Sequence, residues 1–304
     1  MNRPQNAASA EIEQPAGSAG VSSQPRSCLA CGGTYGPSPI SGLLRCRTCG
    51  FTSADVRLGD EQLAALYGRD YFHGQEYHDY RAEEASLRAN FARRIFALRQ
   101  HVPNLEEASV FEIGCAYGFF LDEMKDVARQ AAGIDISRDA VRHAVEQLGV
   151  DATCGDYLLT EIDRCPDLIV MWDTIEHLAR PDLFLAAAAR DLRPGGHIAI
   201  TTGDIGSPVA RFRGRRWRMI HPPTHLHYFS ADTLRLMLDR AGFEVVHLSH
   251  PGVTRNLQSA LYIILALKVG APVLFDVVRR LRVFDFSVTV NLFDIMFVIA
   301  RRGG

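Results

Sequence analysis

Four cysteines near the start of the chain form two closely spaced pairs. Two residues separate Cys28 from Cys31 and also Cys46 from Cys49, and a glycine follows each pair. This spacing lets both thiolates of a pair reach one ion, and two pairs complete a tetrahedral shell. Since no coordination position remains open, the pattern predicts a structural zinc ion rather than a catalytic one.

The role of this cysteine module, residues 27–52, has two interpretations. A segment of this length cannot bury a core of its own, so the metal can act simply as a folding staple. Alternatively, the module forms a surface that contacts a substrate or RNA.

A second candidate site lies in the stretch FEIGCAYGFF. Glu112 belongs to an apolar run typical of a buried strand, and small residues follow at Gly114, Ala116 and Gly118. A strand, a small-residue turn and a helix together predict a cradle for a nucleotide-like ligand. A dinucleotide fingerprint needs glycine where Ala116 and Phe119 stand, so the pattern disfavours a dinucleotide.

The residues downstream agree with a nucleoside ligand. Asp135 ends the next predicted strand, where an acid can hold both ribose hydroxyls. Asp156 follows a weaker strand, and the turn LRPGG precedes another strand. Together with the glycine loop, these motifs resemble the class I S-adenosylmethionine-dependent methyltransferases.

The resemblance covers about residues 110–301 and carries several expectations. It implies an α/β, Rossmann-like sheet of seven strands with an antiparallel last strand, to which DIMFVIARR corresponds. It implies S-adenosylmethionine as the cofactor. The expected cofactor-binding residues are Glu112, Gly114, Ala116, Gly118, Asp135, Asp156 (at the adenine amine) and Asp173.

Methyl transfer from a sulfonium is an in-line displacement that needs an aligned nucleophile, exclusion of water and often a base. In a parallel sheet such groups lie at the carboxyl ends of strands. The stretch MWDTIEHLARP follows one of these strands and contains Asp173, Glu176 and His177. Its acid–histidine pair resembles an element of quinone O-methyltransferases and of sugar methyltransferases.

A second histidine cluster contains His221, His225 and His227, within HPPTHLHYFS. Its ending resembles deoxysugar C-methyltransferases, which also carry a cysteine zinc module and use a Glu-His pair to abstract a proton. His225 matches that histidine, while Thr224 replaces the glutamate. A metal site made by the three histidines is an alternative.

Histidine suits base chemistry at neutral pH, so we expect His225, then His177, to act as the base, with Glu176 beside them. For each histidine the competing interpretation is a hydrogen-bonded packing residue. A run of arginines follows the predicted strand 197–202. Because arginine binds phosphate with two parallel hydrogen bonds, the acceptor could carry a phosphate. The members of the run are Arg211, Arg213, Arg215, Arg216 and Arg218, and a solvated charged face is the alternative.

The chain has 304 residues, a hydrophobic share of 47% and a net charge of -2, which predicts no general affinity for nucleic acid. We divide it into a disordered tail (1–26), a zinc ribbon (27–52), a helical lid or linker (53–105) and a methyltransferase domain (106–304). Tyr71, Tyr77 and Tyr80 could form the lid or pack within its helix.

Strands and helices alternate in the last of these regions, which predicts βαβ crossovers and a mainly parallel sheet. The predicted helices include 181–192 and 231–241. The predicted strands are 110–113, 132–136, 167–172, 197–202, 244–250 and 294–300, with a weaker strand before Gly155.

The apolar stretch from Leu257 contains Lys268, Gly270 and Pro272, which favours a buried helix over a membrane span, with peripheral membrane contact as the alternative. The chain starts without the apolar core of a signal peptide, and its 7 cysteines favour a reducing compartment, so we expect a cytoplasmic protein.

Three functions remain open at this point. The first is methyl transfer to a small molecule such as a sugar, a glycolipid precursor or a secondary metabolite. The second is RNA methylation with the ribbon as the RNA contact; the near-neutral charge and the absence of an aromatic-basic stripe count against it. The third is a non-catalytic S-adenosylmethionine-binding protein.

Overall fold

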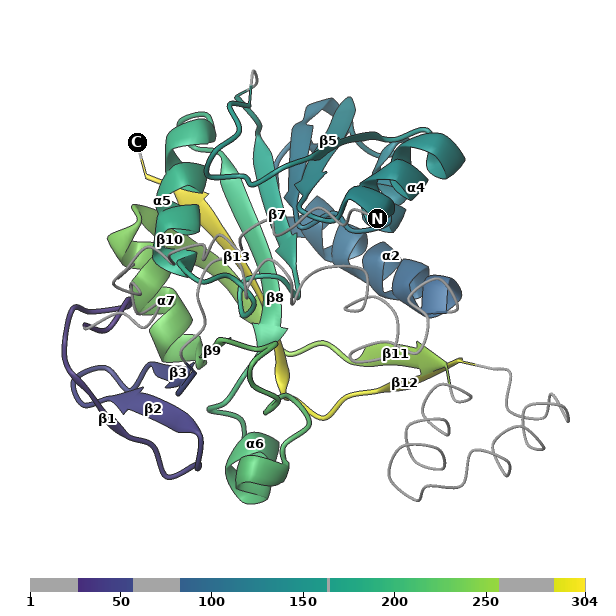
Figure 1. The fold of residues 1–304 in the computed structure, drawn as a ribbon. Coiled ribbons are helices and arrows are strands. Elements are labelled where there is room, and N and C mark those ends of the chain that lie inside the picture. The colour runs from purple at the N-terminus through teal and green to yellow at the C-terminus, as the bar shows by residue number, and fades with distance from the viewer. Residues whose placement is uncertain (1–26, 57–82, 163–164, 257–286, 304) are drawn as a thin grey trace, which may run out of the picture.

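A computed structural model describes residues 27–56, 83–162, 165–256 and 287–303 of the chain (Figure 1). The predicted tail, the three lid tyrosines and the apolar stretch from Leu257 lie outside the described residues.

Seven strands form the central sheet, in the order β10-β13-β8-β7-β4-β5-β6 (Figure 1). Neighbours from β8 to β6 pair in parallel, whereas β13 runs antiparallel to both β8 and β10. This confirms the predicted α/β fold with an antiparallel last strand. The strands are β4 (Ser109–Ile113), β5 (Gln130–Asp135), β6 (Asp151–Cys154), β7 (Leu168–Trp172), β8 (His197–Gly203), β10 (Phe243–Ser249) and β13 (Ile295–Arg302).

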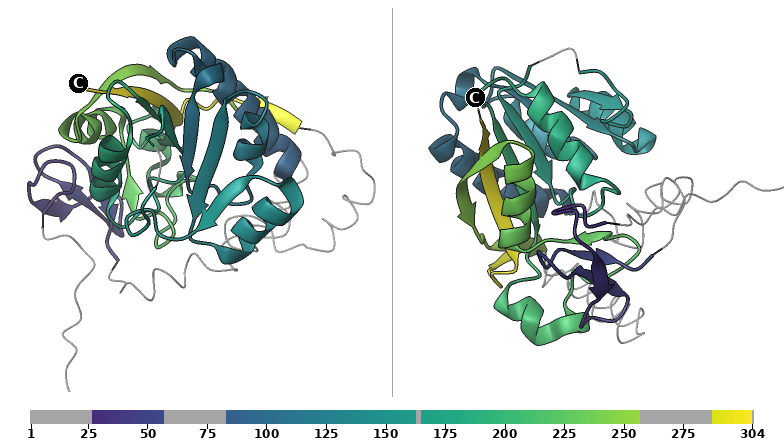
Figure 2. Two further views of the ribbon diagram at one scale, coloured as in Figure 1. Left: turned by 90° about the horizontal axis from the view of Figure 1, so that it is seen from above. Right: turned by 90° about the vertical axis from the view of Figure 1, so that its left-hand side faces the viewer.

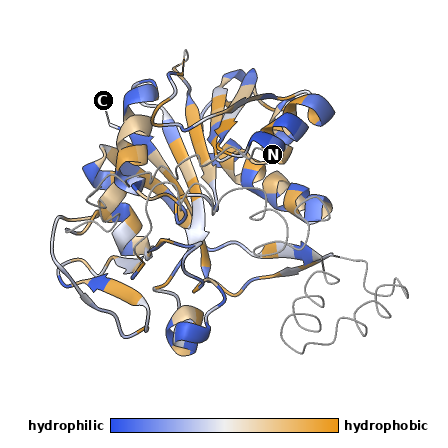
Figure 3. Ribbon diagram, in the orientation of Figure 1, coloured by the Kyte–Doolittle hydropathy of each residue, from blue (hydrophilic) through white to orange (hydrophobic). Residues whose placement is uncertain are grey.

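The central strands are buried on both faces, which explains why they read as continuous apolar runs rather than as alternating ones. In Figure 3 the hydrophobic colour is concentrated on these strands. Successive residues enter different cores: Val110 packs on one face of the sheet and Phe111 on the other.

Helices cover both faces (Figure 2). One core contains residues of α2 (Glu84–His101), α3 (Phe119–Met124) and α4 (Arg138–Leu148). The opposite core contains residues of α5 (Pro181–Asp191) and α7 (Ala231–Arg240).

Helix α2 belongs to the packed core on one face of the central sheet. Its residues Phe91, Ile95 and Leu98 recur at helical spacing and are buried against the sheet. Each such side chain contributes about 1.5–3 kcal/mol by burial. The helix also brings the side chain of Arg94 to Asp173, which follows β7.

The cysteine module folds as a small antiparallel sheet of its own. It contains β1 (Tyr35–Pro37), β2 (Leu43–Cys46) and β3 (Thr52–Ala54). A fourth strand, β9 (His227–Tyr228), belongs to the segment that follows β8 of the central sheet, and it pairs with β3. The ribbon is therefore joined to the histidine segment by main-chain hydrogen bonds.

Two further strands, β11 (Val253–Asn256) and β12 (Ser287–Val290), form an antiparallel arm beside α2 (Figure 1). The sequence patterns do not predict this arm, since only four residues of each strand pair. Within the described residues, no helix has the length and apolar character needed to cross a membrane.

Candidate functional site

The four cysteines of the ribbon lie together, with their sulfur atoms all within 4.8 Å of one another. The Sγ atoms of Cys28 and Cys49 are 3.6 Å apart, and those of Cys31 and Cys46 are 3.5 Å apart. Tetrahedral zinc with Zn–S bonds of about 2.3 Å requires sulfur–sulfur distances of about 3.8 Å. The cluster is compatible with zinc.

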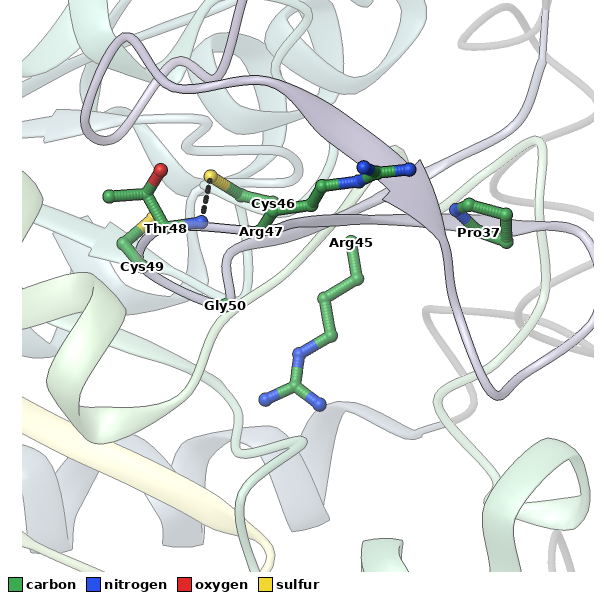
Figure 4. Close-up of a pocket in the computed structure, with 7 residues that line it drawn as sticks. All are labelled: Pro37, Arg45, Cys46, Arg47, Thr48, Cys49 and Gly50. Carbon is green, nitrogen blue, oxygen red and sulfur yellow. Dashed lines mark hydrogen bonds between the residues drawn. The ribbon is translucent and has the colours of Figure 1, made fainter.

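The backbone supports both cysteine pairs. Gly32 and Gly50 adopt positive φ angles of 78° and 80°, which allows the chain to turn beneath the sulfur atoms. The backbone N–H of Thr48 donates to the sulfur of Cys46 at 3.4 Å (Figure 4). A pocket of about 400 Å³ lies next to this pair and is lined in part by Arg45 and Arg47. Figure 4 shows the side chains of these two arginines beside the cysteines.

The glycine loop follows β4 in an unusual backbone conformation. Gly114, Ala116 and Gly118 have positive φ angles of 80°, 46° and 80°. For Ala116 this conformation costs about 1–2 kcal/mol, so the surroundings must hold it there. The carboxylate of Asp135 does so, because it accepts the backbone N–H of Ala116 at 2.8 Å and that of Ser137 at 2.8 Å.

The two glycines of the loop lie against different neighbours. A Cβ atom on Gly114 would lie 2.6 Å from the hydroxyl of Thr174, at the end of β7. A Cβ on Gly118 would lie 2.8 Å from Ala144 and 2.9 Å from Val150, so this glycine permits α4 to pack closely. Both glycines are thus required by close neighbours: Gly114 by Thr174, which follows β7, and Gly118 by the packing of α4.

Glu112 is a buried carboxyl with an oxygen, Oε2, that lacks a hydrogen-bond partner among the described residues. Burial raises its pKa well above the usual range, the charge of Asp135 adds to this, and Arg94 opposes it. An unsatisfied buried oxygen at the end of β4 fits a ligand that brings a hydrogen-bond donor.

Arg94 is a residue of this site that the sequence analysis missed. It reaches from α2, donates to Oδ2 of Asp173 at 2.7 Å and lies 5.0 Å from the ring centre of Trp172. Although burial favours protonation of Asp173, the charge and hydrogen bond of Arg94 hold its pKa below the usual range. Arg94 is therefore a fixed positive charge beside Glu112 and Asp173.

Asp156 occupies a different position from the other acids. It is exposed after β6, and its Oδ1 accepts the backbone N–H of Leu158 at 2.8 Å. Among the described residues its second oxygen accepts no hydrogen bond, so this oxygen is open to a ligand at this end of the sheet.

Glu176, His177 and His225 come together beyond β7, with one ligand atom from each within 4.8 Å of the others. The Nδ1 atom of His177 lies 2.9 Å from the carbonyl of Thr224, and that of His225 lies 3.0 Å from the carbonyl of Met219. A carbonyl oxygen only accepts, so in each ring Nδ1 is the donor. In the neutral ring Nε2 then carries the lone pair.

This arrangement can perform two kinds of chemistry. A neutral histidine with an available Nε2 lone pair can remove a proton from an acceptor. The same two nitrogen atoms together with the Glu176 carboxylate could hold a divalent metal ion, because ligating histidines usually donate the other N–H to a carbonyl. Burial, with His177 and His221 nearby, lowers the pKa of His225 well below its usual range, which keeps it neutral.

His227 does not join His221 and His225 in a metal site, contrary to the alternative considered from the sequence. Its Nδ1 lies 3.0 Å from the hydroxyl of Ser53 and its Nε2 lies 3.4 Å from the carbonyl of Ala179. Both ring nitrogens are used by these contacts. His227 is a packing residue between the ribbon and the segment that follows β7.

Burial lowers the pKa of His227 from 6.5 to about 4. In the unfolded chain the same group titrates near 6.5, so below that pH the unfolded state binds more protons. We expect the free energy of unfolding to fall by about 3 kcal/mol from this residue as the pH drops from about 6.5 to about 4. Urea unfolding at several pH values measures this loss. The free energy of unfolding should depend less steeply on pH in His227→Gln than in the wild type, and an equal dependence in both proteins would contradict the prediction.

The arginine run is divided by the fold. Arg218 forms a two-pronged pair with the buried Asp294, at 2.8 and 3.2 Å, and Trp217 donates to the same carboxylate at 2.9 Å. The suggestion that the run binds a phosphate of the acceptor stays a prediction, and the pairing with Asp294 counts against a part for Arg218. The other four are exposed on α6 (Pro208–Arg213) and the following turn, 214–216.

The sequence profile of the methyltransferase domain matches residues 78–248, more than half of the chain. The chain belongs to this methyltransferase-domain family. A probable S-adenosylmethionine-dependent methyltransferase of Mycolicibacterium smegmatis is 33% identical over 140 residues, which are 45% of this chain and 52% of that protein. The chain thus spans about half the length of that relative.

A ubiquinone biosynthesis O-methyltransferase of Cupriavidus pinatubonensis is 26% identical over 174 residues, 53% of this chain and 69% of that protein. Among solved structures, magnesium protoporphyrin IX methyltransferase of Synechocystis, with bound S-adenosylhomocysteine, superposes with a TM-score of 0.50. It is 13% identical and the match covers 77% of this chain and 92% of that chain, so the likeness concerns the fold.

Proposed function

We propose that the protein transfers a methyl group from S-adenosylmethionine to a small-molecule acceptor. The proposal rests on the grouping of these residues at one edge of the sheet. The glycine loop follows β4, Asp135 ends β5, and the Glu176–His177–His225 cluster lies beyond β7, at the carboxyl ends of neighbouring parallel strands. A cofactor bound at the loop would direct its methyl group towards the histidines, since ligands of open α/β sheets bind at the carboxyl ends of strands.

Each part of the cofactor has a matching group on this edge. Asp135 would accept from the ribose hydroxyls, because each of its oxygens accepts only one backbone N–H and retains a lone pair. Asp156 would accept from the adenine amine. Arg94 would attract the carboxylate of the methionine part, and the unsatisfied oxygen of Glu112 would accept from its ammonium group.

The sulfonium supplies an activated methyl group, so the chain's own task is to position the acceptor and to remove its proton. We assign this base to His225, with His177 as the second choice and Glu176 orienting them. The four exposed arginines would hold a phosphate or carboxylate of the acceptor at the rim of the site. The acceptor class is a phenol, a sugar or another secondary metabolite.

Replacing His225 by alanine tests the base. We expect turnover to fall by about 10²- to 10⁴-fold, the usual contribution of a general base, with little change in affinity for S-adenosylhomocysteine. Turnover is measured as conversion of S-adenosylmethionine to S-adenosylhomocysteine with screened phenolic and nucleotide-sugar acceptors. His247→Ala is the matched control, because His247 is a partly buried histidine on β10 outside the cluster.

Full activity of His225→Ala would show that another residue acts as the base. A chelator that abolishes turnover while the ribbon metal stays bound would favour a metal ion at Glu176, His177 and His225. We assign a structural zinc ion to the ribbon cysteines, and salt-sensitive RNA binding by the ribbon would instead support RNA as the substrate.

A further inference from the structure

The ribbon and the histidine segment of the catalytic domain form one sheet, although 174 positions separate Ser53 from His227 in the sequence. Strands β3 and β9 pair antiparallel, with Ser53 opposite His227. The backbone N–H of Ala54 extends the pairing by donating to the carbonyl of Leu226 at 2.8 Å. This pairing fixes the register and the separation of the two segments.

A buried aromatic side chain connects the second cysteine pair, Cys46 and Cys49, to the pairing of β3 with β9. Phe51 follows the last cysteine pair, and its carbonyl accepts the backbone N–H of Cys46 at 2.8 Å. Its ring is fully buried, stacks on His227 with 5.5 Å between ring centres and contacts Phe229 at 5.3 Å. The geometry of the cysteine pair is thereby transmitted to the ring of His227.

Hydrogen bonds form a second connection, and their direction can be assigned. The Nε2 atom of His227 faces the carbonyl of Ala179, so Nε2 donates and Nδ1 accepts in the neutral ring. The hydroxyl of Ser53, 3.0 Å away, must then donate to Nδ1. Tyr35, 3.0 Å from the Ser53 oxygen, completes the chain by donating to it. The donor and acceptor of each of these hydrogen bonds are thus assigned, and Ser53 of the ribbon holds the ring of His227 in one orientation.

The histidine segment in turn holds the candidate catalytic groups. The backbone N–H groups of Leu226 and His227 both donate to the carbonyl of Glu176, at 2.9 and 3.1 Å. The ring of His177 is held by the carbonyl of Thr224, two residues before Leu226. A displacement of this segment would therefore displace Glu176 and His177 together with the segment's own His225.

We propose that the ribbon is a positioning element of the methyl-transfer site: β3, held by the cysteine metal, acts through Phe51 and Ser53 on His227 and so sets the positions of Glu176, His177 and His225. The catalytic meaning of this coupling rests on the proposed function, but the coupling itself does not. Asp135 and the glycine loop follow β5 and β4, which do not pair with β3 or β9. Cofactor affinity should therefore be independent of the ribbon.

The test compares Ser53→Ala with Ser53→Thr in the full-length, zinc-loaded, ¹⁵N-labelled protein. We expect Ser53→Ala to shift the amide resonances of residues 176–179 and 224–228 and to leave those of 114–118 and 135–137 in place. The hydroxyl of Ser53→Thr should restore the first set. Affinity for S-adenosylhomocysteine, measured by calorimetry, should change by less than about twofold, as expected of independent sites.

Two additions keep the result interpretable. Tyr35→Phe removes only the hydroxyl that donates to Ser53. It should shift the same resonances by a smaller amount, and it provides the test if Ser53→Ala does not fold. When zinc is titrated into the chelator-treated protein, the amide resonances of residues 176–179 and 224–228 should shift together with those of the ribbon. Shifts confined to residues 28–54 in these experiments would overturn the positioning proposal. Failure of the wild-type protein to bind S-adenosylhomocysteine would instead overturn the proposed function.

Discussion

Replacing Asp135 by alanine should reduce the affinity for S-adenosylhomocysteine by at least about 100-fold while the protein remains folded. The carboxylate is expected to accept from two ribose hydroxyls, and hydrogen bonds to a charged group contribute about 1.5–3 kcal/mol each. The substitution also removes the acceptor for the backbone N–H of Ala116, which holds that residue at its positive φ angle. Both effects weaken binding, and calorimetry measures their sum.

Two controls separate these effects. Asp135→Asn retains one oxygen for the ribose or for Ala116, so its affinity should lie between those of the wild type and the alanine variant. Asp139→Ala removes an exposed acid on α4 that pairs with Arg142, and it should bind as the wild type does. Unchanged affinity in Asp135→Ala would refute the ribose role.

Replacing Cys46 by serine should release the ribbon metal and destabilise the protein. A ligand that binds only the folded state contributes about 4 kcal/mol when its free concentration exceeds the dissociation constant 1,000-fold, and this contribution would be lost. Because β3 shares a sheet with β9, we expect the melting transition of the catalytic domain to move as well. Metal analysis and thermal unfolding measure the two effects.

The matched control is Cys154→Ser, which removes an exposed cysteine on β6, outside the metal cluster. It should retain the metal and the melting temperature of the wild type. A metal-free preparation of the Cys46 variant that melts like the wild-type protein would show that the cysteine cluster does not stabilise the fold.

The strands β4, β7, β8 and β13 could be predicted because they are apolar runs that are buried on both faces of the sheet. The same holds for the glycine loop: a strand, three small residues and an apolar helix leave a local pattern. Gly118 shows the limit of that pattern, since the sequence does not reveal that this glycine is needed for the close packing of Ala144.

Two features of the site could not be predicted, because they depend on tertiary contacts. Arg94 is one of several arginines on α2, and only the packing of that helix directs it towards Asp173. Strand β9 contains two residues, too few for a periodic pattern, so the docking of the ribbon on His227 left no local signal. The sequence grouped His227 with His225 because they are neighbours in the chain, whereas the fold assigns them to different contacts.

The central claim is that the carboxyl edge of β4 and β5 binds an adenosyl group and directs its methyl carbon at the histidine cluster. A crystal structure of the full-length protein with S-adenosylhomocysteine tests it most directly. The account predicts density along the glycine loop, with the ribose hydroxyls within hydrogen-bond distance of Asp135 and the sulfur atom facing His225. Density elsewhere on the protein, or none at a saturating concentration of the ligand, would contradict it.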